Sequence, residues 1–147
     1  SSCAWGSFQS ASNPCLRDVH EYLLVFSKGD YKLKRDKKER AAGRIDTIPR
    51  DDFIKHTKSI WSFATERASR VNHPAPFPVE LPRRCIEMYS FVGDVVLDPF
   101  NGSGTTCVAA KSTGRVYIGV DLSEEYCTIA ETRLESVEPW VAPEVTV

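Results

Sequence analysis

Two short apolar runs, each followed by a segment with helical spacing, organise the second half of the chain. Residues 95–98 and 116–120 are rich in valine, leucine and isoleucine, which predicts two strands. Small residues predict a helix over about 103–113, and a second helix is predicted over about 123–135, with Ser123 as its N-cap. The apolar residues at helical spacing around this second helix are Leu122, Tyr126, Ile129, Ala130 and Leu134. The pattern predicts a β-α-β unit followed by a further helix.

The first half of the chain has a weaker pattern. Residues 20–27 are rich in β-forming side chains and end before a lysine and a glycine, which predicts a strand. Asp51 can cap a short helix, and residues 59–63 are predicted to be a short extended piece. The proline-rich residues 73–82 predict a stiff loop that leads into a helix over about 82–90, with its proline in the first turn. The residues of that helix expected to face a core are Leu81, Cys85, Met88 and Tyr89.

The turn after the first predicted strand of the second half has the composition of a nucleoside-binding site. Asp98 ends the strand, and Gly102 and Gly104 allow the backbone to approach a ligand closely. Asp121 ends the next strand, where its carboxylate can accept hydrogen bonds from ribose hydroxyls. Cys107 stands where the third glycine of a dinucleotide-binding fingerprint would be, and there is no Gly-Lys-Ser/Thr of a P-loop. The layout therefore predicts a nucleoside-binding β-α-β unit of another kind.

The composition is that of one ordinary globular domain. Of 147 residues, 41% are apolar and 27% are charged, and no apolar run reaches the length of a membrane span. The five cysteines are odd in number and include no Cys-x-x-Cys pair, which argues against a disulfide framework or a zinc site and favours a reducing cytoplasm. Cys107 and Cys127 are expected to be small core residues. The three histidines share no ligand spacing, so no metal site is expected.

The charge is distributed unevenly along the chain, although the net charge is only −1. Residues 28–58 hold 11 lysines and arginines against 6 acidic residues, whereas residues 90–147 hold 3 against 9. A basic segment beside an acidic domain indicates one face for a polyanion, with the cofactor fold behind it. The alternative is that the basic segment is only a solvated, partly disordered loop.

Four segments resemble motifs of one enzyme family. Residues 98–106 (Asp-Pro-Phe-Asn-Gly-Ser-Gly-Thr-Thr) resemble the cofactor motif of S-adenosylmethionine-dependent DNA amino-methyltransferases, which modify adenine N6 or cytosine N4. Residues 73–81 are similar to the motif that precedes it in the β-type arrangement, in which the catalytic half comes first and the cofactor half last. Residues 118–126, followed by Arg133, resemble the next motif, and residues 13–28 resemble the strand before the variable region. The resemblance covers nearly the whole chain.

This resemblance implies a fold, a cofactor and a set of binding residues. The fold is α/β, the Rossmann-like fold of S-adenosylmethionine-dependent methyltransferases, with an incomplete sheet in this chain. The cofactor is S-adenosylmethionine, with Asp121 on the ribose hydroxyls and the hydroxyls after the turn at the methionine end. The residues implied to bind the cofactor are Phe77, Asp98, Phe100, Gly102, Ser103, Gly104, Thr105, Thr106 and Asp121. From the residues alone, Phe77 can equally be a core residue, Asp98 can simply cap the turn, and Gly119 is expected to permit close helix packing.

The resemblance also divides the chain into regions. Residues 1–27 would end the catalytic region, 28–72 would be a basic variable segment for target recognition or DNA contact, and 73–137 would bind S-adenosylmethionine. Residues 138–147 would form a C-terminal tail. Lysines and arginines in the variable segment would contact phosphates without reading bases. The residues expected to bind DNA are Lys32, Lys34, Arg35, Lys37 and Lys38.

The sequence departs from the family at the catalytic step. Family catalysis uses an Asp/Ser/Asn-Pro-Pro-aromatic tetrad to hold a flipped base, and no Pro-Pro dipeptide occurs in this chain. In the β-type order the tetrad would precede residue 1, so the chain is expected to be a C-terminal portion, inactive alone, that pairs with an N-terminal half, a partner subunit or another copy. The alternative is a non-catalytic cofactor- or DNA-binding subunit or remnant, and a small-molecule or RNA methyltransferase has less support. The target base, the recognition sequence and any accompanying restriction enzyme are not specified.

Overall fold

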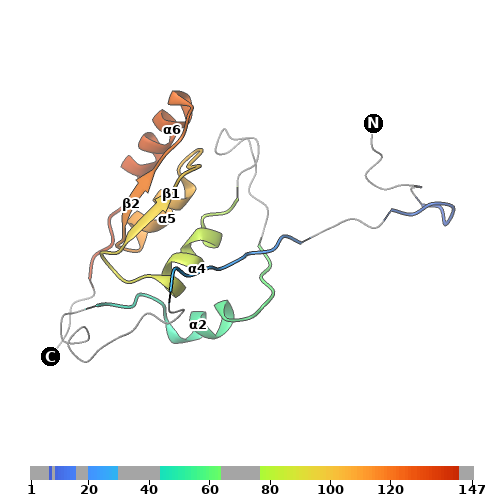
Figure 1. The fold of residues 1–147 in the computed structure, drawn as a ribbon, viewed down its shortest axis with the longest axis horizontal. Helices are drawn as coiled ribbons and strands as arrows, with labels where there is room; N and C mark the ends of the chain where they lie inside the picture. Colours follow the sequence, from blue (N-terminus) through green and yellow to red (C-terminus); the bar gives the residue numbers. More distant parts are fainter. Residues whose placement is uncertain (1–6, 8, 16–19, 30–43, 64–76, 143–147) are drawn as a thin grey trace. The chain divides into compact units, whose positions relative to one another are not determined.

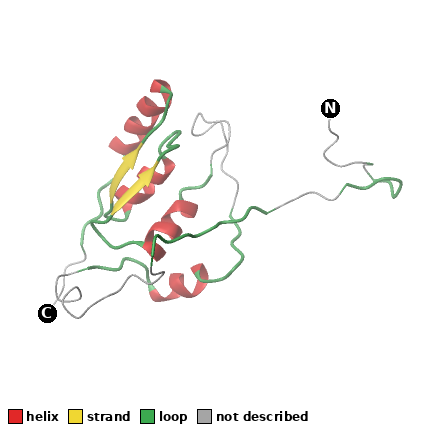
Figure 2. Ribbon diagram, in the orientation of Figure 1, coloured by secondary structure: helices red, strands yellow, loops and turns green. Residues whose placement is uncertain are grey.

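The computed structural model describes residues 7, 9–15, 20–29, 44–63 and 77–142 (Figure 1). The chain divides into two compact units, Ser1–Arg35 and Asp36–Val147. All the regular elements of the described residues belong to the second unit, coloured by type in Figure 2. They are α2 (Arg50–His56), α4 (Glu80–Tyr89), β1 (Val95–Asp98), α5 (Thr105–Ser112), β2 (Val116–Gly119) and α6 (Glu124–Glu135).

The predicted β-α-β unit is confirmed. β1 and β2 pair in parallel, in a register that runs from Val95 opposite Val116 to Asp98 opposite Gly119. A parallel pair needs a crossover connection, and α5 provides it. α5 packs against both strands and also against α4 and α6, so it lies at the centre of the unit (Figure 1). The sequence pattern located both strands and both helices to within about two residues.

The sheet is covered on one face only, within the part of the chain that the structure describes. The core on the covered side consists of Ile86, Ala109 and Ala110, with Val79, Val96 and Tyr117 packed around them. Small alanines allow α5 to lie close to the strands. On the other face Val95 and Leu97 of β1 are 61% and 59% exposed, and their neighbours Val116 and Ile118 are about half exposed. Parallel sheets are normally buried on both faces, so this unit is an incomplete Rossmann-like fold.

Helix α4 begins two residues before the predicted start, and its buried face differs from the predicted one. Pro82 lies in the first turn, as predicted. The buried residues are Pro82, Ile86 and Glu87, whereas Tyr89 is 42% exposed, so its predicted core position is wrong. Cys85 is only half-buried. The predicted core face was placed on the most apolar residues of the helix. In the structure, the core contacts the side of α4 that carries Ile86.

Two predictions in the first half of the chain are also wrong. Residues 20–27 form an exposed loop, with Tyr22 and Phe26 83% and 85% exposed, and the predicted strand is absent. A strand needs a partner for its backbone groups, and none pairs with this segment among the described residues. Asp51 is not a cap, because α2 begins at Arg50 with Pro49 in the N-cap position and no side-chain cap bond. Residues 60–63 have no regular secondary structure.

Helix α6 agrees with its prediction except at one position. Ser123 is the N-cap, and its hydroxyl accepts a hydrogen bond from the Tyr126 amide at 3.3 Å. Ala130 is buried and Tyr126 is half-buried, as the stripe requires, but Leu122 is fully exposed because it precedes the helix. Among the residues described, no helix is long and apolar enough to cross a membrane.

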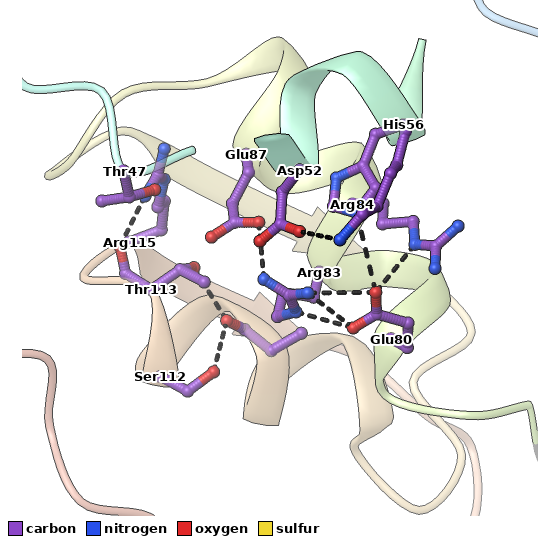
Figure 3. Close-up of polar contacts among 12 residues, drawn as sticks. Thr47, Asp52, His56, Glu80, Arg83, Arg84, Glu87, Ser112, Thr113 and Arg115 are labelled. Carbon is purple, nitrogen blue, oxygen red and sulfur yellow. Dashed lines mark hydrogen bonds and ion pairs between the residues drawn. The ribbon is translucent and has the colours of Figure 1, made fainter. Parts of the chain in front are cut away.

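A buried arginine connects the end of α4 with the turn between α5 and β2. Arg115 is 4% exposed, and its guanidinium donates to the Ser90 carbonyl at 2.6 Å and to the Thr113 carbonyl at 2.5 Å. It also donates to the Thr47 hydroxyl at 2.7 Å, the contact drawn in Figure 3. These bonds satisfy the carbonyl groups that follow two helix ends, which would otherwise be buried without a partner.

Candidate functional site

The glycine turn, residues 99–104, joins β1 to α5 at the carboxyl ends of the two parallel strands (Figure 1). Gly104 holds the N-cap position of α5 in a left-handed conformation, with φ of 81°. A Cβ atom at Gly104 would lie 2.7 Å from the Cβ of Ala130 on α6, closer than two non-bonded carbon atoms can approach. Only glycine combines this left-handed conformation with the absence of a Cβ atom, and it allows the turn to lie directly against α6.

Asp121 binds the glycine turn to the end of β2. Its Oδ2 accepts a hydrogen bond from the Gly102 amide at 2.8 Å, and its Oδ1 accepts one from the Ser123 amide at 2.9 Å. The Asn101 amide also donates to the Val120 carbonyl at 2.9 Å. Both carboxylate oxygens of Asp121 thus accept backbone amides, one in the glycine turn and one at the N-cap of α6.

The other predicted residues at the start of the turn have different surroundings. Asp98 caps the turn, because its Oδ1 accepts the Phe100 amide at 3.0 Å. The ring of Phe100 is 87% exposed, next to the glycine turn. Phe77 is 41% exposed, which argues against the interpretation of Phe77 as a core residue. The two rings are thus accessible to a ligand, and their contact with a cofactor remains a prediction.

The hydroxyl residues at the end of the turn and the start of α5 contact an arginine of α6. Ser103 and Thr105 are 4% and 5% exposed. The Nη1 of Arg133 donates to the Ser103 carbonyl at 2.5 Å, to the Ser103 hydroxyl at 2.9 Å and to the Thr105 hydroxyl at 3.2 Å. Thr106 is half-buried. Sequence reasoning noted Arg133 as part of a motif but assigned it no role.

The expected reason for Gly119 is wrong. A Cβ atom there would lie 2.5 Å from the Cγ of Asn101, so the glycine makes room for a side chain of the turn and not for a helix. The Oδ1 of Asn101 in turn accepts a hydrogen bond from the Cys107 thiol at 3.1 Å. Cys107 is 2% exposed, which confirms it as a small core residue. Burial, together with the negative charge of Asp98, raises the pKa of its thiol to about 11.

A second polar group, here called the α2–α4 cluster, consists of His56, Glu80, Arg83, Arg84 and Glu87 (Figure 3). Arg83 pairs with Glu80 at 2.7 Å and with Glu87 at 2.8 Å, and Arg84 pairs with Glu80 at 2.8 Å. Burial alone would raise the pKa of Glu80, but the hydrogen bonds from the two arginines outweigh it and lower that pKa. Burial raises the pKa of Glu87.

His56 is the buried member of the α2–α4 cluster. It is 2% exposed, its Nε2 lies 3.7 Å from Glu80, and its Nδ1 has no hydrogen-bond partner within the described ranges. Burial and the positive charge of Arg84 lower the pKa of its imidazole. The His56 carbonyl accepts the Trp61 indole N–H at 2.9 Å, and the Arg84 guanidinium lies 5.4 Å from the Trp61 ring centroid. These contacts join α2 to α4 and the loop after α2.

The predicted DNA-binding residues lie outside the described residues, as do residues 73–76 of the proline-rich motif. Their contribution therefore stays a prediction. In the part of the chain that is described, no group of three or more His, Cys, Asp or Glu side chains could hold a metal ion. The residues predicted but not located are Lys32, Lys34, Arg35, Lys37 and Lys38.

The fold and the site together define a class of protein. A parallel β-α-β unit with a glycine turn after its first strand and an acid after its second is typical of α/β proteins that bind a nucleoside-containing cofactor. Residues 4–132 match the family of N6/N4 DNA methylases. The chain therefore belongs to the DNA methylase family.

Individual relatives support this assignment. The chain is 34% identical over 135 residues to the Type II methyltransferase M.MthZI of Methanothermobacter thermautotrophicus, which covers 88% of this chain and 38% of the relative. It is 50% identical over 144 residues to the orphan methyltransferase M.BamHII of Bacillus amyloliquefaciens, which covers 80% of this chain and 54% of the relative. A Thermus thermophilus structure, named as a DNA modification methylase complexed with S-adenosyl-L-methionine, has 33% identity and a TM-score of 0.57, over 81% of this chain and 49% of that one. The chain thus spans about half or less of each relative.

Proposed function

We propose that this chain is the cofactor-binding part of a DNA amino-methyltransferase, which transfers a methyl group from S-adenosylmethionine to the exocyclic amine of adenine or cytosine. The observation that carries the proposal is the bond between Asp121 and the Gly102 amide, which joins the glycine turn to the acidic end of β2 in a member of the DNA methylase family. The complex of the Thermus thermophilus relative with S-adenosyl-L-methionine supports the choice of cofactor. When bound, this cofactor supplies a methyl group on a sulfonium sulfur.

The residues at the carboxyl ends of β1 and β2 have the chemistry that this cofactor needs. The carboxylate of Asp121 lies at the glycine turn, where an acid after the second strand accepts the ribose hydroxyls in nucleoside-binding sites. Phe100 offers an accessible aromatic face beside the turn. The backbone amides at the start of α5 favour a carboxylate, such as that of the methionine end. The cofactor-binding set proposed is Phe77, Asp98, Phe100, Gly102, Ser103, Gly104, Thr105, Thr106 and Asp121.

The exposed face of the β1–β2 pair is proposed as the surface that the catalytic part covers. Val95, Leu97, Val116 and Ile118 expose apolar surface on a parallel sheet, an arrangement that is normally buried. The relatives contain about as much polypeptide again as this chain matches, or more. We infer that polypeptide outside these 147 residues supplies both this cover and the Pro-Pro-aromatic tetrad. The basic variable segment would then contact DNA phosphates.

Calorimetry with two ligands tests the cofactor site. S-Adenosylhomocysteine and its 2′-deoxyribose analogue are titrated into the chain and into Asp121→Asn, with Glu131→Gln on the exposed side of α6 as the matched control. We expect the wild-type chain to bind the ribose ligand about tenfold more tightly than the deoxy analogue, and Asp121→Asn to lose this preference. Equal affinity for both ligands in the wild type, or no binding at millimolar ligand, would contradict the proposed site.

A methylation assay tests whether the catalytic residues lie outside this chain. The chain alone should transfer no methyl group to DNA, because it contains no Pro-Pro-aromatic tetrad. If DNA becomes methylated by this chain alone, the proposal that the catalytic residues lie elsewhere is wrong. A third outcome is that the chain binds the cofactor, but every larger polypeptide that contains this chain fails to methylate DNA. In that case the non-catalytic subunit is the better interpretation.

A further inference from the structure

We propose that Arg133 is a positioning residue that holds the glycine turn in the geometry needed at the methionine end of the cofactor. The inference rests on the proposed function, and it assigns a role to a residue outside the proposed binding set. A single guanidinium nitrogen of Arg133 donates to the Ser103 carbonyl, the Ser103 hydroxyl and the Thr105 hydroxyl. Arg133 therefore binds the residues on either side of Gly104, from a position 30 residues away in the chain.

Helix α6 contacts three consecutive residues, 103–105, where the turn enters α5, with two side chains. Ala130 and Arg133 are three residues apart, so they lie on the same face of the helix. Ala130 packs against Gly104, where no Cβ atom fits, while Arg133 reaches the residues before and after it. The position of α6 is itself linked to the turn through Asp121, which binds both Gly102 and the N-cap residue Ser123. A change at Arg133 would therefore act on the turn and not on a distant surface.

The residues that Arg133 holds make the effect specific to one end of the ligand. Its guanidinium donates to the hydroxyl of Thr105, the first residue of α5, where the helix carries a partial positive charge. The methionine carboxylate is the anion of the proposed ligand, and the backbone amides at a helix start favour an anion. Because Arg133 holds Ser103 and Thr105 in place at this helix start, its loss should affect a ligand with the carboxylate more than one without it.

The test compares two ligands that differ in this end. S-Adenosylhomocysteine contains the amino-acid carboxylate, whereas 5′-methylthioadenosine keeps the nucleoside and lacks it. Both are titrated calorimetrically into the full chain, into Arg133→Gln and into Glu131→Gln, an exposed position on the same helix. We expect Arg133→Gln to weaken the binding of S-adenosylhomocysteine about tenfold or more. The affinity for 5′-methylthioadenosine should change by less than about threefold. Glu131→Gln should leave both affinities unchanged.

Other outcomes separate this inference from the proposed function. If the wild-type chain binds neither ligand, the proposed function fails. If the wild-type chain binds both and Arg133→Gln weakens both equally, or neither, Arg133 has only a general structural role and the inference is overturned. Where Arg133→Gln does not fold, Arg133→Lys is used instead, because it keeps the charge but presents one nitrogen in place of the guanidinium. A smaller but equally selective loss of affinity for S-adenosylhomocysteine is then expected.

Discussion

The glycine turn and the α2–α4 cluster both use charged side chains, but the charges act on different partners. At the turn, Asp121 and Arg133 bind main-chain atoms of Gly102 and Ser103, which are 19 and 30 residues away in the sequence. In the α2–α4 cluster, the ion pairs of Arg83 and Arg84 join residues three or four apart on one helix. Charges bound to distant backbone determine the path of a loop, whereas pairs on one helix face add to helix stability. The contacts of the glycine turn are of the first kind, and those of the α2–α4 cluster are mainly of the second.

The largest effect is expected where the turn meets α6. Gly104→Ala should lower the free energy of unfolding by about 3 kcal/mol, because it combines a left-handed conformation with a close contact to Ala130. Gly93→Ala is the matched control, since Gly93 has φ of 84° and open space around its Cβ position, and should cost about 1 kcal/mol. Urea unfolding measures both. Equal losses would show that the packing of the turn on α6 contributes nothing.

A smaller loss is expected from the centre of the α2–α4 cluster. Glu80→Gln should lower the free energy of unfolding by about 1 kcal/mol at neutral pH, because both arginines lose a charged partner. The pKa of Glu80 is lowered in the folded state, so its contribution is present above the ordinary carboxyl pKa and is lost as the pH falls through the folded value. Urea unfolding at pH 7 and pH 3 should therefore show a difference between wild type and variant that shrinks in acid. A difference that grows in acid would contradict this sign.

A milder pH dependence is expected from His56. Its folded-state pKa is lowered by burial and by Arg84, with Glu80 and Asp52 acting in the opposite direction and Arg83 in the same direction. The contribution of the neutral imidazole is therefore present above its ordinary pKa of 6.5 and is lost as the pH falls below that value. His56→Leu should flatten the fall in stability between pH 7.5 and pH 5.5. The unfolding temperature of both proteins is measured across this pH range. If it falls equally in wild type and variant, His56 is not the source of the pH dependence.

The smallest effect concerns a reaction rate and leaves stability unchanged. Cys107 is buried beneath the turn with a thiol pKa of about 11, whereas Cys15 is exposed. Iodoacetamide at pH 8 should therefore modify Cys15 quickly and Cys107 only after the protein unfolds, because the thiolate is the reactive form. Peptide mass spectrometry measures both sites. Rapid native labelling of Cys107 would mean that the interior of the turn opens readily.

Much of the β-α-β unit and of α6 could be predicted from local patterns, and the exceptions share a cause. The strands 95–98 and 116–119 and the Ser123 cap follow from periodicity and from residue preferences that act over a few positions. The strand predicted at 20–27 failed because a strand depends on a partner, which no local pattern supplies. The role of Gly119 was missed because its neighbour Asn101 is 18 positions away along the chain.

The sequence by itself determined the order of the elements from β1 to α6, the position of the glycine turn and the family to which the chain belongs. These depend on hydrophobic spacing and on positions where only glycine can adopt the required backbone angles. Only the tertiary structure decided that Asp121 and Arg133 would hold the turn from two sides, and that one face of the sheet would stay exposed. Such contacts join residues that are distant in the chain, and they form only when the strands and helices pack together.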